Sequence, residues 1–129
     1  MMKIIELIKK FNKKKKIPNF SYPKFNSDRC RNELSLDDDE VKDFIMQLIK
    51  SLEDKLPLLI KDFENKDFKN IDEKIHLLKG TSTTLGYHGI SDSLTDFYKA
   101  IKNEETLENL KIYVDDYEYY LEELKEFNL

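Results

Sequence analysis

The sequence predicts an all-α protein: an antiparallel up-down four-helix bundle with a short preceding helix and a basic N-terminal tail. Three observations favour this fold. Apolar residues recur at intervals of three and four along most of the chain, which is the spacing of one face of an α-helix. The 129 residues include only three glycines and three prolines, whereas β-rich folds need many tight turns. Charged residues make up 37% of the chain, which suits long helices with solvated faces.

The chain divides at a change of charge into residues 1–24, a basic tail or linker, and residues 25–129, the bundle domain. The tail carries eight lysines against a single glutamate. Met1–Phe11 could form a short amphipathic helix, and the lysine run 13–16 follows it. We expect a tail or a linker to an upstream region. There are two alternatives: the lysines could attach the segment to an anionic membrane surface, or the segment could pack onto the bundle.

Four amphipathic segments follow a short helical turn predicted at Asp28–Leu34. The first begins in Ser35–Glu40, where a capping residue precedes carboxylates that favour the positive end of the helix dipole. Pro57 lies inside this segment and should kink the helix or restart it. The apolar positions of the four segments, in chain order, are Val41, Phe44, Ile45, Leu48, Leu52, Leu56, Leu59 and Phe63; Phe68, Ile71, Ile75, Leu78, Ser82 and Leu85; Ile90, Leu94, Phe97 and Ile101; and Leu107, Leu110, Val114, Tyr117, Leu121 and Leu124.

The ends of these segments carry turn and capping residues. Gly86 and Gly89 are expected to close the second helix, with Gly86 as its left-handed cap. Asn103 can cap the last helix. Because the connections are short, neighbouring helices must run antiparallel.

The composition argues against several classes of protein. Residues 25–129 carry 14 basic and 25 acidic side chains, which argues against a nucleic-acid partner. Cys30 is the only cysteine, so no intramolecular disulfide can form, and its spacing from His76 and His88 does not fit a metal site. No apolar stretch approaches the roughly 20 residues of a transmembrane helix, and the N-terminus is a poor signal peptide. A cytoplasmic location is expected.

His76 lies one residue around the helix from a core position, on a flank that should be open to solvent. Asp72, Lys79 and Gly80 are three or four residues from it and Thr83 is seven residues away, two helical turns on, so all four line up with it. A neutral imidazole nitrogen is a nucleophile near pH 7, and a nearby ammonium could stabilise a phosphorylated ring. Glycine inside a helix costs about 1 kcal/mol relative to alanine, so Gly80 needs a reason. Access for another protein supplies that reason, and these residue types suit a phosphoryl carrier.

The string His-x-x-Lys-Gly at His76–Gly80, followed by Leu85-Gly86, resembles the signature of histidine-containing phosphotransfer (HPt) domains. The resemblance extends from about Phe25 to the C-terminus. It implies that His76 accepts a phosphoryl group from an aspartate of a receiver domain, in a response regulator or hybrid histidine kinase, and passes it to another receiver. Lys79 would stabilise the phosphoryl group, Gly80 would give clearance for the partner, and Gly86 would end the helix.

The resemblance also implies what such a carrier lacks and where it departs from the family. It would be a monomer with no kinase site and no cofactor of its own, because the receiver binds the magnesium ion. Tyr98 stands where many members have a Glu or Gln that hydrogen-bonds the non-reacting imidazole nitrogen. Its hydroxyl could take over that role, or its ring could cover apolar surface, and we favour the second. Asp72, Thr83 and Tyr98 are candidates for contact with the partner.

A second function from another class stays open at this point. The bundle could have lost phosphotransfer and act as a binding module for a response regulator or sensor, and Tyr98 is the feature that favours it. His88 is predicted to have a surface or capping role, because no Lys-Gly pair follows it at the required interval.

Overall fold

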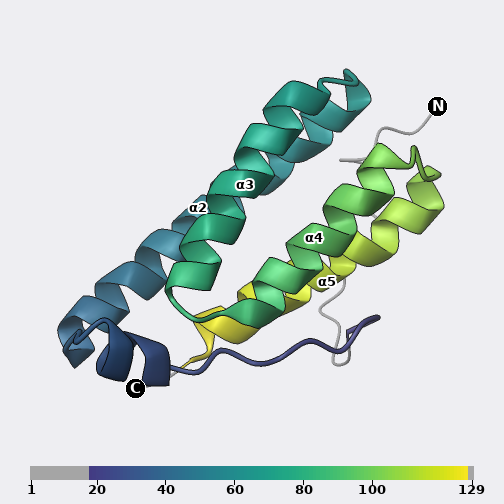
Figure 1. The fold of residues 1–129 in the computed structure, drawn as a ribbon. Helices are drawn as coiled ribbons and strands as arrows, with labels where there is room; N and C mark the ends of the chain where they lie inside the picture. The colour runs from purple at the N-terminus through teal and green to yellow at the C-terminus, as the bar shows by residue number, and fades with distance from the viewer. Residues whose placement is uncertain (1–17, 128–129) are drawn as a thin grey trace.

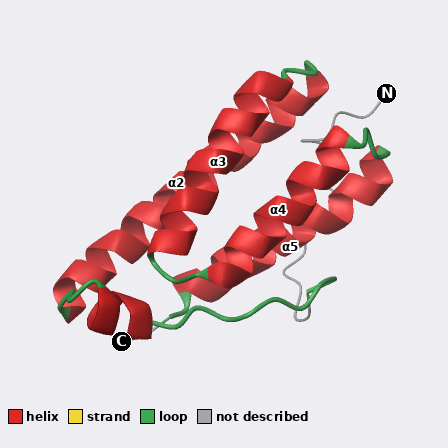
Figure 2. Ribbon diagram, in the orientation of Figure 1, coloured by secondary structure: helices red, strands yellow, loops and turns green. Residues whose placement is uncertain are grey.

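The computed structural model describes residues 18–127, so the predicted helix at Met1–Phe11 lies outside the described residues (Figure 1). Within 18–127 the chain is helical without any strand, and consecutive long helices pack against each other (Figure 2). The first long helix also contacts the last, which closes a four-helix up-down bundle and confirms the predicted fold class. The elements are a π-helical turn η1 (Arg29–Glu33) and helices α2 (Asp38–Glu64), α3 (Phe68–Thr84), α4 (His88–Lys102) and α5 (Leu107–Lys125).

Helix α2 begins within the predicted stretch Ser35–Glu40, and its cap is Asp37 and not the first residue of that stretch. The Asp37 carboxylate accepts a hydrogen bond from the Glu40 N–H at 2.8 Å, and the Glu40 carboxylate accepts one from the Asp37 N–H at 3.2 Å. This reciprocal capping box satisfies two backbone donors at the start of the helix. Pro57 lies inside α2, on an exposed position, and the helix continues through it to Glu64 without restarting.

Gly86 ends α3 in the left-handed conformation, with φ of 84°, as predicted. The Tyr87 N–H donates to the Ser82 carbonyl at 2.8 Å and the Gly86 N–H to the Thr83 carbonyl at 3.0 Å, the pattern of a Schellman motif. The prediction for Gly89 is wrong, because Gly89 lies in the first turn of α4 and does not close α3.

Asn103 does not cap the last helix. It follows the C-terminal end of α4, where its N–H donates to the Lys99 carbonyl at 3.0 Å. The start of α5 is capped by Thr106, whose hydroxyl accepts a hydrogen bond from the Asn109 N–H at 3.2 Å. The chain reverses direction between Asn103 and the start of α5. Glu104 lies in this turn and adopts a positive φ of 52°.

Leu107 lies outside the residues whose side chains are described, and the other predicted positions of the four long helices are buried with two kinds of exception. Phe63 and Phe68 are half-buried, and Phe44, which was predicted as a core residue, is 41% exposed. Phe44 shares the period of the core residues, but the neighbouring helix α3 ends near the start of α2, so Phe44 lies at the rim of the bundle. The hydroxyls of the buried Tyr87 and Tyr117 donate hydrogen bonds to backbone carbonyls, so neither leaves an unpaired polar group in the core.

Residues 19–25, called the strap here, form neither helix nor strand and run across α4 and α5 (Figure 1). The Asp116 carboxylate, only 1% exposed, accepts hydrogen bonds from the N–H groups of Asn19 and Phe20 at 2.7 and 2.8 Å. The Tyr120 hydroxyl donates to the Phe20 carbonyl at 2.7 Å and accepts from the Tyr22 N–H at 2.8 Å. The polar backbone of the strap is therefore paired with side chains of the last helix.

None of the described helices combines the length and the hydrophobicity that a bilayer crossing requires.

Cys30 belongs to η1 and is fully buried, and its thiol donates to the Leu85 carbonyl at 3.2 Å. Burial raises the pKa of this thiol, and the nearby Arg29 guanidinium only partly opposes that effect. Because the thiolate is the reactive form and needs access, we expect iodoacetamide to alkylate Cys30 at least about 100-fold more slowly in the native protein than in urea. Mass spectrometry of timed samples measures both rates, and equal rates would show that η1 does not protect this residue.

Candidate functional site

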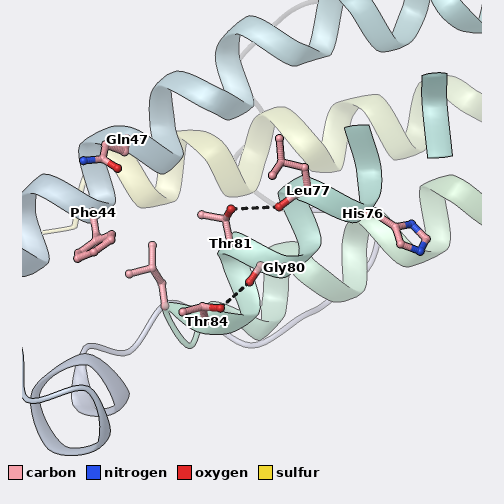
Figure 3. A pocket seen from close by; sticks show the side chains of 8 residues that line it. Phe44, Gln47, His76, Leu77, Gly80, Thr81 and Thr84 are labelled. Carbon is pink, nitrogen blue, oxygen red and sulfur yellow. Dashed lines mark hydrogen bonds between the residues drawn. The ribbon is translucent and has the colours of Figure 1, made fainter. Parts of the chain in front are cut away.

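His76 projects into solvent from the middle of α3, and its side chain is 71% exposed. Its neighbour Ile75 is 1% exposed and points into the core, as the helical spacing predicts. In Figure 3 the imidazole is directed away from Phe44 and Gln47 of α2. Another molecule can reach so exposed an imidazole, so the geometry permits nucleophilic attack on a partner's group.

Asp72 and Tyr98 lie beside the imidazole. The Asp72 Oδ1 atom is 3.6 Å from the His76 Nδ1 atom, one helical turn away. The Tyr98 hydroxyl, which comes from α4, donates a hydrogen bond to the same Asp72 oxygen at 2.5 Å. The Tyr98 ring packs against the core, as favoured from the sequence, but its hydroxyl is engaged with Asp72 as well.

Lys79 lies one turn after His76, is half-buried, and forms no ion pair with any residue of 18–127. Its ammonium is therefore available to an anionic group near the imidazole. Thr83, in contrast, already has a partner within the bundle, because its hydroxyl lies 3.1 Å from that of Ser91 in α4. This contact ties the end of α3 to α4.

Gly80 occupies an open position on the helix surface. A Cβ atom added there would meet no atom of another segment or side chain of residues 18–127 within 4 Å. Alanine would therefore fit the fold, and it would lower the conformational entropy lost on folding. Packing within the described chain gives no reason for a glycine at this position.

A shallow groove of about 490 Å³ lies between α2 and α3 next to His76. Figure 3 shows Phe44 and Gln47 of α2 on one side and residues of α3 on the other. Two large apolar side chains are exposed at this site, Phe44 at 41% and Leu77 at 57%. The lining residues are Phe44, Gln47, His76, Leu77, Gly80, Thr81, Thr84 and Leu85.

Sequence reasoning missed this groove. Phe44 fits the apolar period of its helix, and that period alone predicts a buried position. Leu77 follows His76 directly and lies off the core period of α3, and a large apolar residue at such a position is the one signal that could have indicated an exposed apolar surface.

No group of three or more His, Cys, Asp or Glu side chains within residues 18–127 is arranged to hold a metal ion. His88 is exposed at the first position of α4 and does not line the groove. The candidate site therefore consists of the side chains around His76 and the adjoining groove.

Comparison with protein-family models, curated proteins and solved structures finds no match to this chain. Membership of the HPt family thus stays a prediction from the sequence signature.

Proposed function

We propose that this protein is a histidine phosphotransfer protein of a phosphorelay, in which His76 accepts a phosphoryl group from the aspartyl phosphate of a receiver domain and passes it to another receiver. The observation that carries the proposal is the open position of Gly80 one turn after an exposed histidine. A helix-interior glycine costs about 1 kcal/mol relative to alanine, and no packing within the described chain requires this one. Close approach of a partner to His76 explains the cost.

The groove supports the same function, because an exposed apolar surface next to the imidazole is suited to a protein partner. Burying the rings and methyl groups of Phe44 and Leu77 on association would favour binding by the hydrophobic effect. A receiver bound there would bring its aspartyl phosphate to His76 and would supply its own magnesium ion. Lys79 would then contact the phosphoryl oxygens, where a charge-assisted hydrogen bond is stronger than a neutral one.

The test is phosphate uptake by the full chain from a set of phosphorylated receiver domains. We expect the wild-type protein to acquire acid-labile, base-stable phosphate, which is the stability of phosphohistidine. His76→Gln should abolish uptake, and His88→Gln is the matched control that should retain it, because His88 is exposed but lacks the lysine and glycine of the site.

Two results would count against phosphotransfer. Uptake by His76→Gln would show that another residue is phosphorylated. Binding of a receiver with no phosphate uptake from any donor would favour the second function, a bundle that only binds a response regulator or sensor.

A further inference from the structure

Asp72 stands between His76 and Tyr98 and is placed to contact both. Its Oδ1 atom receives the Tyr98 hydroxyl at 2.5 Å and lies 3.6 Å from the His76 Nδ1 atom. One carboxylate oxygen can accept two hydrogen bonds, so both contacts can exist together. The distance to Nδ1 is just beyond hydrogen-bond length, and a small rotation of the exposed imidazole closes it.

Tyr98 is held in place independently of His76. Its ring packs against the core, and the Lys102 ammonium lies 5.6 Å from the ring centroid. The hydrogen bond to Asp72 is the main cause that raises the pKa of the Tyr98 hydroxyl, so this group stays a donor at neutral pH. The carboxylate of Asp72 is thus fixed from α4, although Asp72 itself belongs to α3.

We propose that Asp72 and Tyr98 are positioning residues that set the tautomer of His76: Asp72 accepts the Nδ1 proton, and Tyr98 holds the Asp72 carboxylate in place. The hydrogen bond made by one imidazole nitrogen decides which nitrogen carries the proton. With the proton on Nδ1, the lone pair of Nε2 is free for attack. The side chains found here differ from the single Glu or Gln of the family pattern, since a carboxylate one turn before the histidine is combined with a tyrosine of the next helix.

The consequence for phosphoryl transfer rests on the proposed function. The Nε2 lone pair attacks phosphorus, the N–P bond forms, and the bond between phosphorus and the receiver's aspartyl oxygen breaks, which releases a carboxylate. The Nδ1 proton stays on the ring, so the product is a phosphorylated imidazolium. The Asp72 carboxylate faces that new positive charge, and it stabilises the product and the transition state that leads to it.

Tautomer populations test the pair without any partner. Ring ¹⁵N chemical shifts of the full chain, at a pH where His76 is neutral, report which nitrogen is protonated. We expect the Nδ1–H form to dominate in the wild type, to become the minor form in Asp72→Ala, and to decrease in Tyr98→Phe. Glu73→Ala is the matched control, because it removes an exposed carboxylate of the same helix and should leave the populations unchanged. A dominant Nε2–H form in the wild type, or no change in Asp72→Ala, would overturn the proposal.

Transfer rates give the second measurement. With a receiver that loads the wild type, Asp72→Ala should be slower by about tenfold, the factor given by loss of one charge-assisted hydrogen bond. An unchanged rate would overturn the role of the pair in transfer. If no receiver loads the wild type, the proposed function fails, whereas the tautomer result still decides whether Asp72 and Tyr98 position the ring.

Discussion

Replacement of Gly80 by glutamine is expected to slow phosphoryl transfer to His76 by about 100-fold without lowering the free energy of unfolding. The side chain would enter the open space beside the imidazole, where no neighbouring segment or side chain of residues 18–127 lies within 4 Å. The open groove beside Gly80 can take the longer side chain, whereas a receiver docked at His76 as proposed would be displaced by it. A displacement of the reacting groups by about 1 Å can cost about 100-fold in rate. Glutamine is also a better helix former than glycine, so stability should hold or rise.

The measurement combines single-turnover transfer from a phosphorylated receiver with urea unfolding of the same variants. Gly80→Ala is the matched control. Its single methyl group should raise the free energy of unfolding by about 0.5–1 kcal/mol and slow transfer far less than glutamine does. Transfer at the wild-type rate in Gly80→Gln would show that the open space is not used by the partner. A large loss of stability in either variant would mean that the glycine is needed by the fold.

The general architecture could be predicted because its determinants are local. The 3–4 spacing of apolar residues fixed which face of each helix is buried, and the sequence around Asp37 contains the complete capping box. Gly86 could be assigned as a left-handed cap since it follows the last apolar residue of its helix. The exposure of His76 followed from the same period, because its neighbour Ile75 is in the core.

The features that could not be predicted depend on contacts between distant segments. The period of α2 gives Phe44 the same phase as its core residues, and only the position of α3 decides that Phe44 is at the rim. The sequence favoured Tyr98 as a ring that covers apolar surface over a hydroxyl that contacts His76; the ring does pack on the core, but the contact of its hydroxyl with Asp72 beside His76 was not foreseen. A second glycine so soon after Gly86 predicted a helix end. The structure shows another reason for Gly89, its close contact with the strap, and a contact with a distant segment cannot be seen in the local sequence.

Gly89→Ala is expected to lower the free energy of unfolding by about 2 kcal/mol, although Gly89 lies in a helix where alanine is normally preferred. A Cβ atom at this position would lie 1.9 Å from the Pro23 carbonyl oxygen and 3.1 Å from the Tyr87 ring. The oxygen belongs to the backbone of the strap, so it cannot move without the strap. The strap would therefore shift away from α4 and weaken its hydrogen bonds to Asp116.

Urea unfolding of Gly89→Ala and Gly80→Ala compares the same substitution at two helical glycines. The free energy of unfolding should fall in Gly89→Ala and rise in Gly80→Ala. Amide hydrogen exchange identifies the cause. The N–H groups of Asn19 and Phe20, which donate to Asp116, should exchange faster in Gly89→Ala and in Asp116→Ala but not in Gly80→Ala. A stabilised Gly89→Ala with unchanged exchange at these two amides would mean that the strap does not pack closely on α4. A destabilised Gly89→Ala with faster exchange at these amides would show that Gly89 is required by its contact with the strap. A stabilised Gly80→Ala would show that the fold does not require Gly80, as expected if that glycine serves the approach of a partner.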